Sequence, residues 1–531
     1  MSADAPASQD QPALLHAETL LASGNLEEAR AALAGLPPEV MHTPRAYALR
    51  HSLRPSVLPG LAAPVPPTEA RRIEAALNSN QPEAALTMAR TLAARLPHAA
   101  MPWRAQALAC LALHRYSEAC DAASEALLRS PDQPQLYADL ARALYELGEV
   151  EALRAPAEAA VAGLPDDPQA VRLAAVAAHI HGDRSTARRH FAHLAKLQPN
   201  NGAAHRALSE LTRYSDRKDA HVTKMLKQVK SGKLTPFEEL EFHFALGKAY
   251  GDLNRPRDAF RHYARGNALK KSAYGLSVVR YREECTRLHA PFDAPPAIKA
   301  RIVPILIVGL PRSGTTLAET LLSAHSQVGT VGECPYLRQH LLPALINGTT
   351  PEALAKVRDG YLTTLAKADA PFVVDKMPLN FPMIGALHSL LPETRIIAMR
   401  RDPMALGWSL YRQCFVKAGN GFAYDLKDIA EAQRLYIDTL DHWRIAGVPV
   451  RDLSYTALTE APEPTLRTML DDLGLPWEDA CLTTARKNRA VATASSLQVR
   501  DGIYTGSDAD WQPYAKYLEP LRNSLTDLKL L

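Results

Sequence analysis

A short polar loop follows a run of apolar residues just past the middle of the chain. The apolar run is 304–308, and the loop reads Pro311-Arg312-Ser313-Gly314-Thr315-Thr316, at the start of a helix-like stretch, 315–325. The backbone N–H groups of such a turn and the positive end of the helix dipole attract the same anion. The guanidinium of Arg312 adds a planar pair of donors for phosphate or sulfate oxygens, and the neighbouring hydroxyls add more. The sequence therefore predicts an anion-binding site here.

The spacing of the glycines leaves the kind of anion open. Gly309 and Gly314 have the G-x-x-x-x-G spacing of loops that bind nucleoside triphosphates, but Thr315 stands where such a loop carries its lysine. Triphosphate chemistry also needs Mg²⁺, which is usually held through an apolar strand that ends in aspartate. Val373-Val374-Asp375 could supply that aspartate. A nucleotide kinase or hydrolase therefore stays open as an alternative.

Apolar runs of strand length alternate with helical segments through the C-terminal part of the chain. The runs are 304–308, 371–374, 395–399 and 448–450, and the helical segments are 315–325, 381–391, 403–417, 427–445 and 464–474. Such alternation predicts an α/β domain with a mainly parallel sheet, which binds ligands at the carboxyl ends of its strands. Arg312, Lys376 and Arg401 each come just after a run, so we expect these three residues to gather on one rim of the sheet.

The loop and the motifs that follow it resemble the sulfotransferases that use 3′-phosphoadenosine-5′-phosphosulfate (PAPS). Within that group, the chain is most similar to tyrosylprotein sulfotransferases and to bacterial relatives that carry helical repeats. Glu333 lies 21 residues after Arg312 (333 − 312), which is the spacing of the family's catalytic glutamate. Asp375-Lys376-Met377-Pro378 is similar to the family's lysine segment, and Arg401 with Ser409 is similar to its clamp for the 3′-phosphate. The resemblance covers roughly residues 300–515.

The resemblance implies a transfer of a sulfuryl group from PAPS to an acceptor hydroxyl, without a metal. Arg312 and Lys376 would neutralise the leaving phosphate, and Glu333 would act as the general base. Further contacts with the nucleotide are implied for the loop residues Ser313, Gly314, Thr315 and Thr316, and for Arg401, Ser409, Tyr455, Ser495, Gln498 and Arg500. Without the resemblance, we would interpret these residues as ordinary charged residues at strand ends and as loop side chains. Tyr455 would then be a half-buried structural tyrosine.

Two positions depart from the tyrosylprotein pattern. Those enzymes carry arginines after the catalytic glutamate that engage an acidic acceptor peptide, whereas the stretch 334–340 holds only Arg338. A lysine is expected just before a late tryptophan, but Asp510 precedes Trp511. The first departure leaves the acceptor open among protein tyrosine, carbohydrate and a small alcohol. The second puts one contact with the nucleotide in question.

Prolines recur at a fixed step in the N-terminal half. Pro97, Pro131, Pro165 and Pro199 follow one another every 34 residues (131 − 97), which is the period of the tetratricopeptide repeat (TPR), a pair of antiparallel helices. Two further sets keep this phase: the turn residues between paired helices, Asn80, His114, Gly148 and Gly182, and a small-residue site at Ala85, Ala119, Leu153 and Ala187, where leucine is the exception. Another unit, 240–273, follows a capping box at Thr235-Pro236-Phe237-Glu238.

The predicted architecture is an all-α TPR solenoid followed by an α/β P-loop-like domain. We expect N-terminal helices and a loop at 1–66, TPR-type repeats at 67–290 and a sulfotransferase domain at 300–531. A solenoid of this kind presents a concave groove, so an acceptor protein or peptide is the expected partner of the repeats. A repeat scaffold with an inactive sulfotransferase-like domain stays open as a further alternative.

Composition limits the other classes of function. The formal net charge of +4 is too slight to imply a nucleic-acid partner. The six cysteines are scattered without a C-x-x-C pair, which makes a disulfide framework or a zinc site unexpected. The N-terminus lacks a signal-peptide pattern, and the sequence has no apolar span of 18 residues, so we expect a cytoplasmic protein that does not enter a membrane. A homo-oligomer is compatible with these features.

Overall fold

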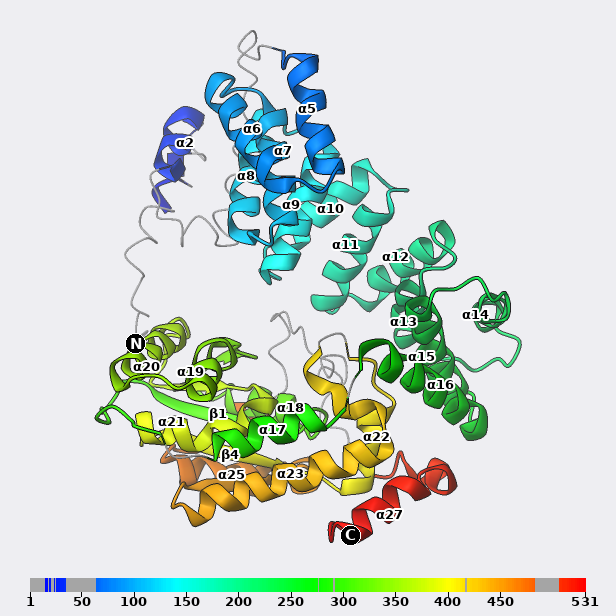
Figure 1. The fold of residues 1–531 in the computed structure, drawn as a ribbon, viewed down its shortest axis with the longest axis vertical. Coiled ribbons are helices and arrows are strands. Elements are labelled where there is room, and N and C mark those ends of the chain that lie inside the picture. Colours follow the sequence, from blue (N-terminus) through cyan, green and yellow to red (C-terminus); the bar gives the residue numbers. More distant parts are fainter. Residues whose placement is uncertain are drawn as a thin grey trace. The chain divides into compact units, whose positions relative to one another are not determined.

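The computed structural model of the chain describes residues 15–17, 19–20, 23, 25–34, 64–275, 277–289, 292–415, 418–482 and 506–531. By their internal contacts, the residues form two compact units, Met1–Ala204 and His205–Leu531. The described part of the first unit is helical, and the second combines helices with one sheet (Figure 1). The predicted limits of the repeat region and of the transferase domain stay predictions.

Helices of the first unit pack as consecutive antiparallel pairs, as the period of 34 residues predicted. After α2 (Leu26–Ala34), the pairs are α5 (Pro67–Asn78) with α6 (Pro82–Arg95), α7 (Ala100–Ala112) with α8 (Tyr116–Arg129), α9 (Pro134–Leu147) with α10 (Arg154–Gly163), and α11 (Pro168–Ile180) with α12 (Arg184–Leu197). The four periodic prolines fall in the connections that follow these pairs. The all-α TPR-type region is therefore confirmed.

Backbone angles and burial explain the two other periodic positions. The turn residues Asn80, His114, Gly148 and Gly182 have φ values of 55°, 58°, 88° and 82°, so each adopts the left-handed conformation that lets the chain reverse within a short turn. All four small-residue positions are completely buried. Leu153, the exception in size, precedes α10, whereas Ala85, Ala119 and Ala187 lie inside their helices. The longer side chain thus coincides with a shortened helix.

The second unit begins with a further group of helices. These are α13 (Gly202–Glu210), which contains the boundary, α14 (Ala220–Lys230), α15 (Pro236–Asp252), α16 (Pro256–Tyr274) and α17 (Val279–Leu288). The predicted capping box is present, because Glu238 N–H donates to Thr235 Oγ1 at 3.3 Å and Thr235 N–H donates to Glu238 Oε2 at 2.8 Å. Gly247 of α15 allows close packing, since a Cβ there would lie 2.8 Å from the Tyr263 ring of α16.

Five parallel strands form the sheet of the second unit. Their order is β2 (Val328–Gly332), β3 (Phe372–Asp375), β1 (Val303–Val308), β4 (Arg395–Arg400) and β5 (Val450–Ser454). The register places Leu306 opposite both Asp375 and Ile396, so the carboxyl ends of the three central strands lie together. The parallel α/β sheet is therefore confirmed. The strand β2 was not predicted from the sequence.

Alternate residues of the central strands face two apolar clusters. Ile305 and Ile307 belong to a cluster with α18 (Thr315–Leu322) and α25 (Pro462–Leu473). Leu306 and Val308 belong to a larger cluster on the other face, which contains residues from the following elements: α21 (Ile384–Leu390), α22 (Pro403–Tyr411), α23 (Leu426–Ile445), α27 (Glu519–Asp527), and the helices α15 to α17. The helices α15 to α17 thus share one apolar core with the sheet.

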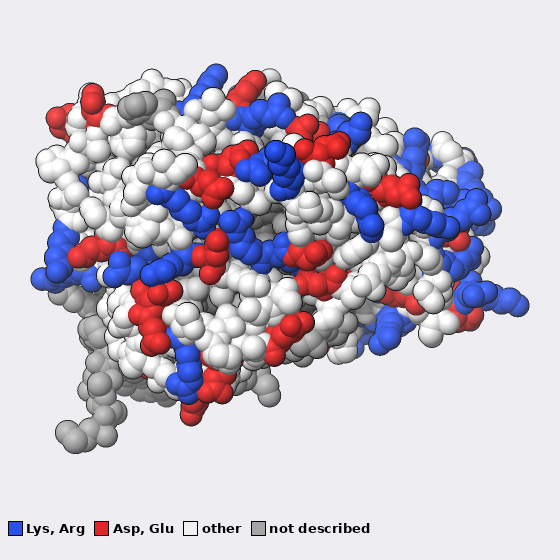
Figure 2. Space-filling model, turned by 90° about the horizontal axis from the view of Figure 1, so that it is seen from below, with Lys and Arg blue, Asp and Glu red and all other residues white. Residues whose placement is uncertain are grey.

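Some predicted helices differ in their limits. The segment 381–391 is a 3₁₀ turn, Pro378–Met383, followed by α21, because Pro382 cannot donate a helical hydrogen bond. The helix predicted at 403–417 ends at Tyr411. Among the described helices, none has the length and apolar character needed to cross a membrane. The face seen in Figure 2 carries basic and acidic side chains mixed over most of its area, in keeping with the small net charge of +4.

Candidate functional site

The anion loop connects the end of β1 to the start of α18. Arg312 and Gly314 have φ values of 70° and 102°, and both lie in the left-handed region. A Cβ at position 314 would lie 2.4 Å from Cδ2 of Tyr455, so only glycine fits against this tyrosine. The turn leads directly into α18, and the first N–H groups of a helix have no partner within it, so an anion can bind at this N-terminus.

Hydroxyl groups of the loop are buried beside this turn. Ser313 is 1% exposed, and its Oγ atom has no hydrogen-bond partner among the described residues. An unsatisfied buried hydroxyl costs about 1–3 kcal/mol, which a bound anion oxygen could recover. Thr315 and Thr316 are buried in the first turn of α18. The loop residues named from the sequence therefore lie together, and one of them lacks a partner that an anion would provide.

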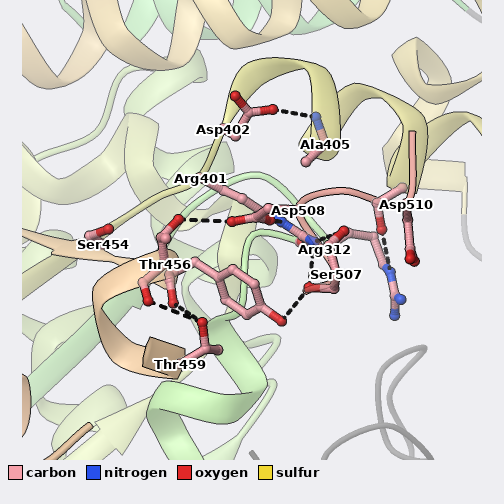
Figure 3. A network of polar contacts seen from close by, with 12 residues as sticks. Arg312, Arg401, Asp402, Ala405, Ser454, Thr456, Thr459, Ser507, Asp508 and Asp510 are labelled. Carbon is pink, nitrogen blue, oxygen red and sulfur yellow. Dashed lines mark hydrogen bonds and ion pairs between the residues drawn. The ribbon is translucent and has the colours of Figure 1, made fainter. Parts of the chain in front are cut away.

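Arg401 reaches this loop from the end of β4. One terminal nitrogen, Nη1, donates to the carbonyl oxygen of Arg312 at 2.7 Å, and Nη2 donates to Ser507 Oγ at 3.0 Å (Figure 3). Nε donates to Asp508 Oδ1 at 2.8 Å, and the guanidinium carbon lies 4.4 Å from the centre of the Tyr455 ring. Arg401 and Tyr455, both predicted from the sequence as contacts with the nucleotide, thus lie together beside the loop.

Arg312, Arg401 and Arg412 bring three guanidinium groups close together beside the loop. Arg312 Nε donates to Ser409 Oγ at 3.3 Å, which places the predicted serine on α22 beside the loop. Burial, followed by the positive charges of Arg412 and Arg401, lowers the pKa of Arg312 to about 9. Like charges held together in a partly buried site favour the binding of an anion that neutralises them. By contrast, Arg400 points to Asp452 of β5, with a distance of 3.0 Å from Nε to Oδ1.

Two aspartates near the C-terminus pair with these arginines, and the sequence did not reveal this. Asp508 contacts Arg401, and its other oxygen accepts a hydrogen bond from Thr456 Oγ1 at 2.8 Å (Figure 3). Asp510, which replaces the expected lysine, lies 3.0 Å from Nη2 of Arg412. The chain thus places carboxylates where a phosphate is expected. The predicted contacts Ser495, Gln498 and Arg500 lie outside the described residues.

Lys376 and Glu333 form a second group on the same rim. Lys376 follows β3 and is completely buried, and its Nζ atom donates to Glu333 Oε1 at 2.8 Å. The Glu333 side chain, which follows β2, keeps 32% exposure, so a substrate hydroxyl can approach it. The carboxylate of Glu319 on α18 lies 3.6 Å from the same Nζ atom and was not predicted as a site residue. Nothing in the sequence distinguishes Glu319 from an ordinary glutamate on a helix.

Main-chain hydrogen bonds connect the lysine segment to the loop. Gly309 N–H donates to Pro378 O at 3.0 Å, and Lys376 N–H donates to Gly332 O at 2.9 Å. Lys376, Arg312 and Arg401 follow β3, β1 and β4, which are neighbours in the sheet. The three basic residues therefore lie along one rim, as the alternation of strands and helices predicted.

Asp375 has surroundings that do not favour the Mg²⁺ role considered for it. Its Oδ2 atom accepts a hydrogen bond from Tyr361 at 2.9 Å, and the residue is 1% exposed. Burial raises the pKa of this carboxyl to about 7, so near neutral pH a large share of it is protonated. Among the described residues, no group of three or more His, Cys, Asp or Glu is arranged as a metal site.

Comparison with known proteins agrees with this geometry. Residues 304–479 match the sulfotransferase family. An uncharacterised protein of Aquifex aeolicus is 36% identical over 239 residues, which cover 41% of this chain and 31% of that protein. Protein-tyrosine sulfotransferase 1 of Danio rerio is 25% identical over 208 residues, which cover 35% of this chain and 58% of that protein. The sulfotransferase-like character of the C-terminal region, inferred from its motifs, is thus confirmed.

One solved structure aligns at low identity and with a low TM-score. The sulfotransferase domain of the Synechococcus PCC 7002 olefin synthase aligns with a TM-score of 0.32 and 20% identity, covering 42% of this chain and 91% of that domain. This chain covers 31% of the length of the Aquifex aeolicus protein and 58% of the length of the Danio rerio protein. The likeness therefore concerns part of each protein.

Proposed function

We propose that the protein is a PAPS-dependent sulfotransferase that transfers a sulfuryl group to the hydroxyl of a protein tyrosine. The arrangement of two groups on one rim carries this proposal. Arg312, Arg401 and Ser409 surround the loop, and Lys376 pairs with Glu333 beyond the end of the neighbouring strand. The first group suits a nucleotide with two anionic ends, and the second suits removal of a proton near a charge that develops during transfer.

Each residue has a defined task in this reaction. The loop N–H groups, Arg312 and Lys376 bind the phosphate from which the sulfuryl group leaves, and they neutralise the charge it gains. The acceptor oxygen forms the new bond to sulfur, the bond between sulfur and the phosphate oxygen breaks, and Glu333 takes the acceptor proton. Arg401 and Ser409 bind the 3′-phosphate, which distinguishes PAPS from an ordinary adenine nucleotide. PAPS supplies the group that is transferred.

Arg401→Ala should remove the preference for a 3′-phosphate. Charge-assisted hydrogen bonds contribute about 1.5–3 kcal/mol, so we expect the affinity for adenosine 3′,5′-bisphosphate to fall at least roughly tenfold. Binding of adenosine 5′-monophosphate should change little. Calorimetric titration of both ligands measures the difference. Arg400→Ala is the matched control, because Arg400 is the adjacent arginine but pairs with Asp452 outside the site.

Other outcomes would favour other functions. Tight binding of ATP with Mg²⁺, without regard to a 3′-phosphate, would contradict the proposal and favour a nucleotide kinase or hydrolase. Binding of the bisphosphate without transfer to any acceptor, in the wild type and in a Glu333→Gln variant alike, would favour a repeat scaffold. Asp375 argues against the kinase, because its carboxyl is buried, accepts a hydrogen bond from Tyr361 and has a raised pKa.

Asp508→Asn should tighten binding of adenosine 3′,5′-bisphosphate. All three guanidinium nitrogens of Arg401 already have partners, so a 3′-phosphate competes with the Asp508 carboxylate for Nε. Removing one competing ion pair is worth about 1 kcal/mol, or roughly fivefold in affinity. Asp452→Asn, on the neighbouring arginine, should leave the affinity unchanged. Weaker binding by the Asp508 variant would show instead that this carboxylate orients Arg401 for the phosphate.

The identity of the acceptor is the more specific part of the proposal. Support for protein tyrosine comes from the similarity to named protein-tyrosine sulfotransferases. Arg338 is not available for an acidic acceptor, because its Nη2 atom lies 2.9 Å from both carboxylate oxygens of Glu284. A shallow, open pocket of about 400 Å³, lined by Lys271, Tyr411 and Tyr424 among others, lies beside α16, a helix of the predicted repeats. We propose that the repeats recruit the acceptor protein.

A labelled donor tests the identity of the acceptor. Incubating the protein with PAPS labelled in its sulfate and with host lysate should place the label on protein tyrosines. Label on carbohydrate or on small molecules would overturn the tyrosine assignment and keep the sulfotransferase. All six cysteines are buried and none of them forms a disulfide, which fits the proposal that the protein works in the reducing cytoplasm.

A further inference from the structure

A second carboxylate flanks the buried lysine, and neither the family resemblance nor the motifs give it a role. Glu319 lies on α18, and its Oε2 atom is 3.6 Å from Lys376 Nζ. Its other oxygen, Oε1, accepts a hydrogen bond from Thr330 Oγ1 at 2.8 Å. The Glu319 side chain is only 12% exposed, so protein groups and not bulk solvent are its main surroundings.

Thr330 connects this carboxylate to the turn that carries Glu333. Thr330 Oγ1 accepts a hydrogen bond from Gly332 N–H at 3.0 Å, and Gly332 O accepts one from Lys376 N–H at 2.9 Å. Gly332 has a φ of 69°, which favours glycine at this turn. The helix that begins at the anion loop is therefore connected, through Glu319 and Thr330, to both the lysine and the glutamate of the site.

We infer that Glu319 is a positioning residue for sulfuryl transfer, which holds the Lys376 ammonium between the leaving phosphate and Glu333. This inference rests on the proposed function. A lysine ammonium has three N–H donors. Glu333 accepts one of these donors, and the Glu319 carboxylate lies at ion-pair distance, 3.6 Å, on the same ammonium, so a donor remains for the phosphate. When Glu333 takes the acceptor proton it loses its charge, and Glu319 then remains as the counter-charge of a completely buried ammonium.

The charges around Lys376 allow a test that a purely structural role would not pass. Lys376 interacts with three carboxyl groups, Glu319 on α18, Glu333 after β2 and Asp375 at the end of β3. Removing the negative charge at position 319 would favour the ionised form of Glu333, because a like charge is lost. The same change would disfavour the protonated form of Lys376, because an opposite charge is lost. Both limbs of the pH profile should therefore move to lower pH.

Glu319→Gln keeps the shape of the side chain and an oxygen for the Thr330 hydroxyl, but it removes the charge. We expect kcat to fall roughly tenfold or more, the KM for PAPS to change by less than about threefold, and the pH profile of kcat to move down by about 0.5–1 pH unit. Glu283→Gln is the matched control, since Glu283 is an exposed carboxylate on α17. That variant should leave all three quantities at the wild-type values.

The outcomes separate this inference from the proposed function. Sulfate transfer by the wild type supports the function, and a Glu319→Gln variant with wild-type kcat and pH profile would then overturn the role of Glu319 alone. A wild type without any transfer would overturn both. Thr330→Val provides a second measurement: it keeps the charge, so kcat should fall while the pH profile stays in place. Unchanged kcat in this variant, or failure of both variants to unfold cooperatively on heating, would also overturn the inference.

Discussion

Replacing Glu333 with glutamine is expected to lower kcat by roughly a hundredfold to ten-thousandfold, the range found for loss of a general base. Affinity for adenosine 3′,5′-bisphosphate should stay nearly unchanged, because the glutamine removes a base and no phosphate ligand. The glutamine oxygen can still accept the hydrogen bond that Lys376 Nζ donates to Glu333 Oε1 at 2.8 Å. The substitution therefore changes the proton acceptor and keeps the local packing.

Steady-state transfer of labelled sulfate, with a parallel titration of the bisphosphate, measures both quantities. A loss confined to kcat, with kcat/KM for PAPS falling equally, marks an interaction made only in the transition state. Glu283→Gln again serves as the control on an exposed carboxylate. A Glu333→Gln enzyme with wild-type kcat would contradict the general-base role, and Glu319 would then be the next carboxylate to examine.

The strands that carry the site were predictable to different degrees. β1, β3 and β4 could be predicted from their apolar runs, because they are central strands and apolar residues lie on both of their faces. β2 reads Val-Gly-Thr-Val-Gly and lies at the edge of the sheet, where only one neighbour pairs with it. Glycine and threonine weaken the apolar signal of such a strand. The sequence therefore indicated Glu333 through its spacing from Arg312 and not through the strand that precedes it.

The basic residues of the site and Glu333 were predictable from the sequence, whereas the other carboxylates were not. Arg312, Lys376 and Arg401 each follow a strand, so their positions on the rim follow from the parallel topology. The partners Asp508 and Glu319 come from segments far from these arginines and lysines in the sequence, or from a helix face, and no local pattern marks them. Whether a carboxylate in such a segment faces solvent or an arginine depends on the tertiary fold.

The helices before the sheet belong to the same compact unit as the sheet, whereas the sequence-based division of the chain separates the two. The sequence predicts a sulfotransferase domain at 300–531, after a junction near 290–303. In the structure, the ring of Phe260 on α16 stacks on Tyr411 and Tyr517, with ring centres 5.7 and 5.3 Å apart. Asn267 Nδ2 donates to Tyr411 O at 2.9 Å. These contacts belong to one compact unit that begins at residue 205.

A chain of residues 199–531 should therefore fold and bind adenosine 3′,5′-bisphosphate, whereas a chain of residues 292–531 should not. Losing α13 to α17 would uncover Trp408 and Tyr411, which are 1% and 6% exposed. Burial of one such side chain contributes about 1.5–3 kcal/mol, and a folded unit is stable by only about 5–15 kcal/mol in total. The buried Lys270, whose Nζ donates to Phe415 O, would also be lost.

Thermal unfolding and bisphosphate titration of the two shortened chains measure this difference. The longer chain is the matched control, since it lacks residues 1–198 but keeps every contact named above. A cooperative transition and full affinity in the shorter chain would show that the sheet folds without the preceding helices, as the division predicted from the sequence assumes. The expected result, folding of the longer chain alone, would mean that α15 and α16 keep the helical pattern of a repeat while serving as part of the transferase core.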